Sequence, residues 1–291
     1  IIGFGSLSSK ILSVRLSIGE LGLSGILFMT ILSYLTNLFV PHGFIHNSLF
    51  LTLGLLAFFL ILKKKLFQKK IKLTLLVSSI LFIGILMYKT HDDFFYYHFP
   101  YTISLIEFKK IFGLGNLEHG FRTPSSIFYF NSLFYLPYIK YNLFHAHGLY
   151  TLIFFNILCL KFIFEKIKSK NYDFFYFLYL LSFIFINCFF YRIAEFGADR
   201  AGQILVFLIF IKYFEIINFN NKTDNIKKDI VLLILFTVLA ASMKAYFFIY
   251  FIIPAILLLN KKRFFTFINL KSMKIISVFS FFILLIFSIN F

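Results

Sequence analysis

Long, uninterrupted apolar stretches recur along this chain, and they constrain its fold more than any other feature. Most run for about 17–22 residues, which is the length that an α-helix needs to cross the hydrocarbon core of a bilayer. Of the 291 residues, 60% are hydrophobic and only 14% are charged. A water-soluble domain needs more polar surface than this, and a membrane β-barrel would show short alternating segments instead. The sequence therefore predicts an all-α, polytopic transmembrane helical bundle.

Hydropathy predicts about nine spans, which form a single membrane domain over residues 1–291. The predicted spans are 18–40, 45–62, 73–88, 144–164, 173–191, 201–218, 229–243, 245–259 and 275–291. The seventh and eighth are short and meet at Ser242, Met243 and Lys244, which indicates a tight helical hairpin. Because the sequence starts at Ile1 and stops at Phe291 inside an apolar stretch, we expect it to be a fragment at both ends.

The basic residues predict the orientation of the chain in the membrane. The formal net charge is +17, but most lysines and arginines fall in short clusters between apolar stretches rather than on one polar face. That distribution is typical of membrane topology and not of a nucleic-acid partner. Alternate loops, beginning with the N-terminal one, hold most of the basic residues, so the positive-inside rule predicts a cytoplasmic N-terminus. We expect an integral protein of the bacterial inner (plasma) membrane.

Histidines and acids gather on the opposite side. All 7 histidines and half of the 12 acidic residues fall in outer loops or at the outer ends of spans. Cytoplasmic loops are short and rich in Lys and Asn. A functional site, if the chain has one, is therefore expected to face the periplasm or the exterior.

One connection is much longer than the others, and long loops often carry function. This extracytoplasmic loop covers residues 89–143. The segment from Pro100 to Phe112 shows helical spacing of apolar residues against Glu107, Lys109 and Lys110, which predicts a helix lying on the membrane surface. Glycines end it, and a second aromatic helix is predicted from Ser126 to Tyr138.

An acidic pair, Asp92 and Asp93, opens this loop directly after a predicted span. It can simply mark a helix end in water. In a chain so poor in acids, however, two adjacent carboxylates followed by FFYYHFPY favour a functional role. A carboxylate at the membrane boundary can act as a general base for a hydroxyl acceptor or bind a divalent cation.

The acidic pair and the tyrosine three residues beyond it, in DDFFY, resemble the first outer loop of the GT-C glycosyltransferases. These polyprenyl-phosphate-sugar-dependent enzymes include protein mannosyltransferases and the lipid A aminoarabinose transferase. The two predicted surface helices are similar to those of that loop, and LAASMKAYFFIYFIIPAILLL is similar to a short helix pair of the same proteins. The segments HDDFFYYHFPY, GLGNLEHGFRTPSS and YRIAEFGADRAGQIL also resemble a group of uncharacterised bacterial membrane proteins associated with this superfamily.

The resemblance covers roughly residues 71–259 and implies a role for the acidic pair. Asp92 would be the catalytic or metal-binding carboxylate, with Asp93 beside it, and the metal would be Mg or Mn. The chain departs from the family pattern because two spans precede the one that should open the core fold.

Each of the other charged residues in the outer loops can have either a structural or a functional role. Glu195, Asp199 and Arg200 lie in YRIAEFGADR, which is either a turn with paired surface charges or a second part of the site. Lys244 and Arg122 either reach the membrane surface or bind a phosphate. The remaining candidates for substrate binding flank the acidic pair and are His91 and Tyr96.

The resulting prediction is a membrane glycosyltransferase that moves a sugar from a polyprenyl-phosphate donor to an unknown acceptor on the extracytoplasmic face. A transporter or flippase for lipid-linked saccharides is the main alternative, although transporters usually carry charges near mid-membrane. A polysaccharide polymerase and a non-enzymatic scaffold also remain open.

Overall fold

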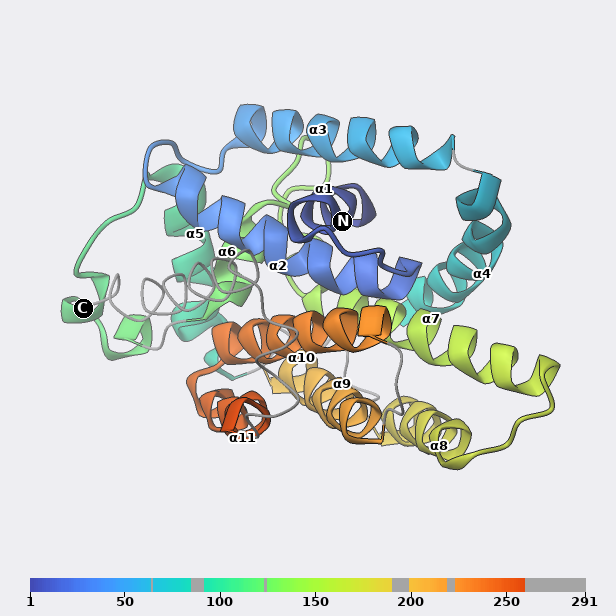
Figure 1. The fold of residues 1–291 in the computed structure, drawn as a ribbon. Helices are drawn as coiled ribbons and strands as arrows, with labels where there is room; N and C mark the ends of the chain where they lie inside the picture. Colours follow the sequence, from blue (N-terminus) through green and yellow to red (C-terminus); the bar gives the residue numbers. More distant parts are fainter. Residues whose placement is uncertain (64, 85–91, 123–124, 190–198, 219–222, 260–291) are drawn as a thin grey trace.

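The computed structural model describes residues 1–63, 65–84, 92–122, 125–189, 199–218 and 223–259, and every regular element in these ranges is helical (Figure 1). The predicted all-α class is confirmed. The elements are α1 (Ile2–Leu12), α2 (Ile18–Asn37), α3 (Phe44–Leu62), α4 (Lys65–Phe82), the π-helical η2 (Phe94–His98), α5 (Phe99–Glu107), η3 (Leu114–Asn116), η4 (His119–Arg122), α6 (Ser126–Ser132), α7 (His147–Lys168), α8 (Phe174–Phe189), α9 (Asp199–Ile217), α10 (Thr223–Met243), η5 (Ala245–Phe251) and α11 (Ile252–Leu259).

Within the described residues, three helices are long and apolar enough to cross a membrane: α2, α3 and α7. The prediction of nine spans is not supported. Helix α8 has only 16 residues, and α9 contains charged side chains, among them Lys212 and Glu215. The last predicted span, 275–291, lies outside the described residues.

Helix α3 lies across the outside of the bundle (Figure 1). Of the three candidate spans, it exposes the largest share of its apolar residues. Only 17% of its most apolar window is buried. Ile45, Leu49 and Leu60 are all more than half exposed. A row of exposed apolar side chains along a whole helix is unfavourable in water, whereas the hydrocarbon of a bilayer can cover it. Its exposure is therefore consistent with a membrane protein.

Helices α2 and α7 occupy the centre of the bundle, and glycines let their neighbours approach closely. A Cβ atom at Gly22 of α2 would lie 2.0 Å from the ring of Phe154 in α7. One at Gly5 of α1 would lie 1.8 Å from the backbone oxygen of Leu21. Small residues allow such helix contacts in lipid, where packing has to hold helices together. Helix α1 was not predicted as an element.

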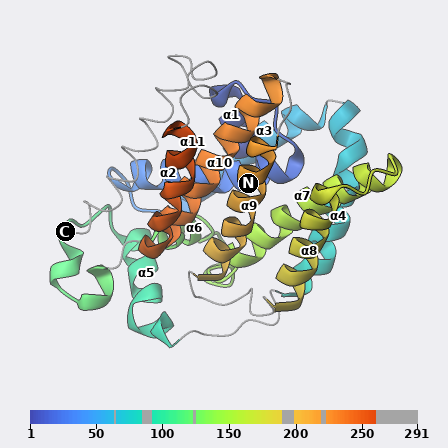
Figure 2. The ribbon, with the colours of Figure 1, turned by 60° about the horizontal axis from the view of Figure 1, so that its bottom comes forward.

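Helices α7, α8, α9 and α10 form the other half of the molecule, with α9 and α10 side by side (Figure 2). Helix α10 also packs on α2, which joins the two halves. The boundary between the two short predicted spans agrees with the structure, because α10 ends at Met243 and Lys244 is extended before η5 begins. One hydrophobic core continues from Phe4 to Leu257.

Both helices of the long loop are shorter than predicted. The first predicted helix ends at Glu107, where Phe108 turns extended, and the second ends at Ser132 instead of Tyr138. Pro137 explains the early end, because proline cannot donate the helical hydrogen bond and restricts the residue before it. Lys110, expected on a polar helix face, is instead buried beside Tyr101.

Buried polar groups fix this loop to the ends of α2 and α3. His42 is fully buried, and its Nδ1 lies 2.7 Å from Ser132 Oγ. Its backbone N–H donates to the carbonyl oxygen of Leu105 at 2.9 Å. The Asn47 amide donates to the carbonyl oxygens of His42 and Ser132 at 2.7 and 2.8 Å. The α2–α3 turn, α5 and α6 are thus held together at one end of the bundle.

Candidate functional site

Side chains from three distant segments meet at the end of the bundle where α9 begins and α10 ends. Two hydrogen bonds bring the long loop there. Ser125 Oγ, at the start of α6, donates to the carbonyl oxygen of Met243 at 2.6 Å, and Ser126 Oγ lies 3.0 Å from Ser242 Oγ. All four residues are buried, so these bonds hold the loop against the α10–η5 junction beside Lys244.

Lys244 forms an ion pair with Asp199, the first residue of α9. Its ammonium nitrogen also lies 5.5 Å from the centre of the Tyr246 ring. Both charged side chains are about one-third to one-half exposed, so water screens the pair and its contribution to stability is small. The pair therefore places a cation and a carboxylate at an accessible position rather than locking the fold.

Asp93, at the start of the long loop, contacts Tyr97. The Tyr97 hydroxyl donates to Asp93 Oδ2 at 3.5 Å, the upper limit for a hydrogen bond. Burial, then Asp93, then Asp199 raise the pKa of Tyr97 to about 12. Both carboxylates thus disfavour the charged form of this phenol, which connects Asp93 and Asp199 electrostatically although they are far apart in the sequence. We call Asp93, Tyr97, Asp199 and Lys244 the acidic-end cluster.

Packing fixes the positions of these groups. A Cβ atom at Gly120 would lie 2.6 Å from the side chain of Tyr97, so η4 covers the ring closely. A Cβ atom at Gly202 would lie 2.0 Å from the ring of Phe247, which brings the start of α9 against η5. Two glycines thus allow the close contacts that set Tyr97 near Asp93 and Asp199 near Lys244.

The other predicted site residues lie around this cluster or beyond it. Asp92 is exposed at the edge of a described range. Tyr96 is exposed too, and a hydrogen bond to the Glu118 carboxylate raises its pKa. The exposed Arg122 donates from Nε to the carbonyl oxygen of Gly115 at 2.8 Å, and Arg200 donates to Gln203 Oε1 at 3.2 Å. His91 and Glu195 lie outside the described residues.

A divalent cation would find few ligands here. Among the described side chains, no group of three or more His, Cys, Asp or Glu residues is close enough to hold a metal ion. Asp93 and Asp199 supply two carboxylates at the cluster. Asp199 is already paired with Lys244, so a Mg²⁺ ion at Asp93 would depend on the phosphate of a substrate for most of its remaining ligands.

Comparison with known families matches residues 1–291 to the family described as Domain of unknown function (DUF8201). The chain belongs to this family. No curated protein and no solved structure matches the chain significantly. The match covers the whole length of this DUF8201 chain, so the bundle, the long loop and the acidic-end cluster all fall within the family's sequence.

Two features of the site in this DUF8201 chain were not predicted from the sequence, one residue and one contact. Tyr97 was not singled out, because 17 tyrosines and 47 phenylalanines hide any one aromatic residue. The pairing of Ser125 with Met243 was also missed, since it joins positions 118 residues apart. A signal for Tyr97 does exist: it follows Asp93 by four residues, the spacing that brings side chains together on one helical face.

Proposed function

We propose that this chain is a membrane glycosyltransferase that moves a sugar from a polyprenyl-phosphate donor to an acceptor on the extracytoplasmic face. The observation that carries the proposal is the acidic-end cluster, in which Asp93, Asp199 and Lys244 come together from three segments. These are the residue types that the resemblance to GT-C enzymes leads us to expect, at one end of an all-helical bundle.

The proposed chemistry needs a base and cations. The acceptor hydroxyl attacks the anomeric carbon, its proton passes to a carboxylate, and the bond from that carbon to the phosphate oxygen breaks. Asp93 is the proposed base because it lies beside Tyr97 in the acidic-end cluster, and Asp92 next to it is the second candidate. Lys244, Arg122 and Arg200 supply positive charge for the departing polyprenyl phosphate. A Mg or Mn ion at Asp92 or Asp93 would neutralise the same phosphate.

The proposal includes the topology. About nine spans would bring the cytoplasmic N-terminus and the extracytoplasmic cluster to opposite sides of the bacterial inner membrane. Among the described residues, three helices are long and apolar enough to cross a membrane, which supports a membrane location. A transporter, flippase or polymerase of lipid-linked saccharides would also need such a bundle, but none of them requires a base at Asp93.

The test is glycan transfer in membranes that contain the full-length protein at matched expression. Asp93→Asn and Asp92→Asn remove the charge at almost constant size, and Glu107→Gln is the control because Glu107 is an exposed acid of the same loop. Loss of a general base lowers the rate by roughly 10²–10⁴-fold. We expect this loss for Asp93→Asn and none for Glu107→Gln. If both aspartate variants keep full transfer, the glycosyltransferase proposal fails and the transport alternative moves ahead.

A further inference from the structure

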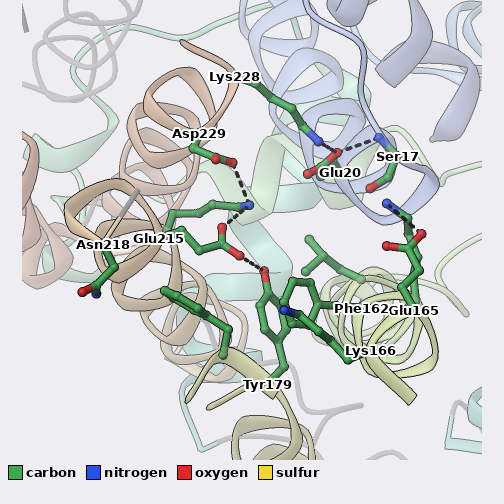
Figure 3. Close-up of a pocket in the computed structure, with 14 residues that line it drawn as sticks. Ser17, Glu20, Phe162, Glu165, Lys166, Tyr179, Glu215, Asn218, Lys228 and Asp229 are labelled. Carbon is green, nitrogen blue, oxygen red and sulfur yellow. Dashed lines mark hydrogen bonds and ion pairs between the residues drawn. The ribbon is translucent and has the colours of Figure 1, made fainter. Parts of the chain in front are cut away.

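A cavity of about 490 Å³ lies at the end of the bundle opposite to Lys244, near the starts of α2 and α10 and the ends of α7 and α9 (Figure 3). Its volume is in the range of small-molecule binding sites. Eight of its 14 lining residues are charged, in a chain with only 14% charged residues. We call it the ion-pair cavity, and its charged residues are Glu20, Lys161, Glu165, Lys166, Lys212, Glu215, Lys228 and Asp229.

The floor of the ion-pair cavity is acidic. Lys212 Nζ donates to Glu215 Oε2 at 2.6 Å and to Asp229 Oδ1 at 2.9 Å. Glu20 forms the third carboxylate, and its Oε2 accepts from Ser17 N at 2.6 Å. These four charged side chains are between 5% and 13% exposed. Glu20 also pairs with Lys228 Nζ at 2.8 Å, so three carboxylates meet two ammonium groups and the floor keeps one net negative charge. Carboxylates with remaining acceptor sites can take a further ammonium group.

Three further lysines lie nearer to the mouth of the cavity. Lys161, Lys166 and Lys228 are 21–33% exposed, so their ammonium groups are closer to solvent than the floor. They pair with Glu165, Asp173 and Glu20 respectively. An ammonium group has three donors, so a phosphate oxygen can share each of these lysines with its carboxylate partner. Phe162, stacked on Tyr179 at 4.0 Å between ring centres, and Phe175 supply an apolar wall.

The carboxylates of the floor and the lysines nearer to solvent together favour a ligand that carries both signs. A simple anion would meet the carboxylates of the floor, and a simple cation would meet the lysines of the mouth. A molecule with its amine inward and its phosphate outward satisfies both sets of groups. Buried ionisable groups in a membrane protein are costly, and they commonly mark binding sites.

We propose that the ion-pair cavity binds a primary amine joined to a phosphate, the chemistry of the phosphoethanolamine group. The amine lies among Glu20, Glu215 and Asp229, and the phosphate lies against Lys161, Lys166 and Lys228. The group has two sources, the headgroup of a membrane phospholipid and a free phosphoethanolamine-type metabolite. The proposal does not depend on the glycosyltransferase activity, because the two sites lie at opposite ends of α9.

The experiment measures binding to the purified full-length protein. In one arm, nanodiscs of phosphatidylcholine are doped with phosphatidylethanolamine or with phosphatidylglycerol, and retained lipid is counted by native mass spectrometry. Phosphatidylcholine lacks N–H donors on its quaternary amine, and phosphatidylglycerol lacks the amine. In the other arm, radiolabelled phosphoethanolamine is titrated in detergent. Saturable binding of phosphatidylethanolamine alone identifies the lipid, and saturable binding of the free compound identifies the metabolite; either supports the site.

Variants separate this site from non-specific binding. Lys166→Gln removes a mouth cation and Glu215→Gln a floor carboxylate, and each is expected to weaken binding roughly tenfold, as loss of a charge-assisted hydrogen bond does. Lys168→Gln, an exposed lysine of the same helix outside the cavity, is the matched control. If Glu215→Gln misfolds, the test rests on Lys166→Gln, because Lys166 is partly exposed and its replacement should not disturb the fold. Absence of saturable binding in both arms, or equal binding by Lys166→Gln and wild type, overturns the proposal and leaves a structural ion-pair network.

Discussion

Lys110 shows how this chain accommodates a buried cation. Its Nζ donates to the Tyr101 hydroxyl at 3.1 Å and lies 5.5 and 5.6 Å from the ring centres of Tyr101 and Tyr129. The negative faces of aromatic rings attract an ammonium group and partly replace its water. Burial still lowers the pKa of Lys110 to about 8, because the charged form loses hydration. A periodicity argument alone placed this lysine on a polar face, because it assumed a helix as far as Phe112, whereas the chain turns extended at Phe108 and brings Lys110 between Tyr101 and Tyr129.

His42 leads to a prediction about pH. Burial and the neighbouring His46 lower the pKa of His42 from 6.5 to about 3. Between these values, the unfolded chain binds a proton that the folded chain does not. The free energy of unfolding should therefore fall as pH drops below 6.5, by about 1.4 kcal/mol per pH unit until pH approaches 3. Urea unfolding in detergent at pH 7, 6, 5 and 4 measures the slope.

The comparison with His42→Gln isolates this histidine from other titrating groups. Glutamine keeps a polar side chain near Ser132 but binds no proton in this range. The variant should be less stable than wild type at pH 7 and should show a shallower loss of stability toward pH 4. Equal slopes in the two proteins would mean that His42 does not stay neutral in the folded state.

At the scale of the helices, the second prediction concerns the close contact between α9 and η5. Gly202→Ala places a Cβ atom 2.0 Å from a ring atom of Phe247, whose side chain is 1% exposed and has no room to move. Alanine favours a helix over glycine by about 1 kcal/mol, but overpacking costs about 1–3 kcal/mol. The expected result is a lower melting temperature and reduced glycan transfer, since η5 must shift and Lys244 with it.

A second glycine provides the control for this packing argument. Among the described residues, a Cβ atom at Gly84 would meet Leu149 Cδ1 alone, at the ordinary contact distance of 3.5 Å. Gly84→Ala should therefore leave both the melting temperature and transfer close to wild type. If Gly202→Ala behaves in the same way, the close approach of α9 and η5 does not position Lys244.

Helix positions were easier to predict from the sequence than contacts between helices. Apolar length located α2, α3 and α7 within a few residues, and Lys244 was correctly placed at a break. Helix α1 was missed because glycines and serines dilute its apolar signal, and these glycines matter only once α2 packs on them. The Asp199–Lys244 pair joins the first residue of α9 to the α10–η5 junction, 45 residues away, and local sequence patterns carry no information on such a pairing.

Over the whole molecule, α9 and α10 connect two chemically different ends. Helix α9 begins at Asp199 in the acidic-end cluster and carries Glu215 of the ion-pair cavity 16 residues later, a rise of about 24 Å. That distance approaches the thickness of a bilayer core. If the helices cross a membrane, the two sites therefore face opposite sides, and a ligand at one has no direct access to the other.

The orientation of these ends gives the last prediction, and cysteine labelling in intact cells tests it. In a background with Cys159→Ala and Cys188→Ser, we place one cysteine at a time at two exposed positions, Tyr138 in the long loop and Lys168 at the end of α7. A cytoplasmic N-terminus puts Tyr138→Cys outside and Lys168→Cys inside. A membrane-impermeant maleimide should label Tyr138→Cys in intact cells and Lys168→Cys only after permeabilisation. The reverse pattern would place the acidic-end cluster in the cytoplasm, where an extracytoplasmic glycosyl transfer cannot occur. Labelling of both positions in intact cells would mean that the bundle does not separate its two ends across a membrane.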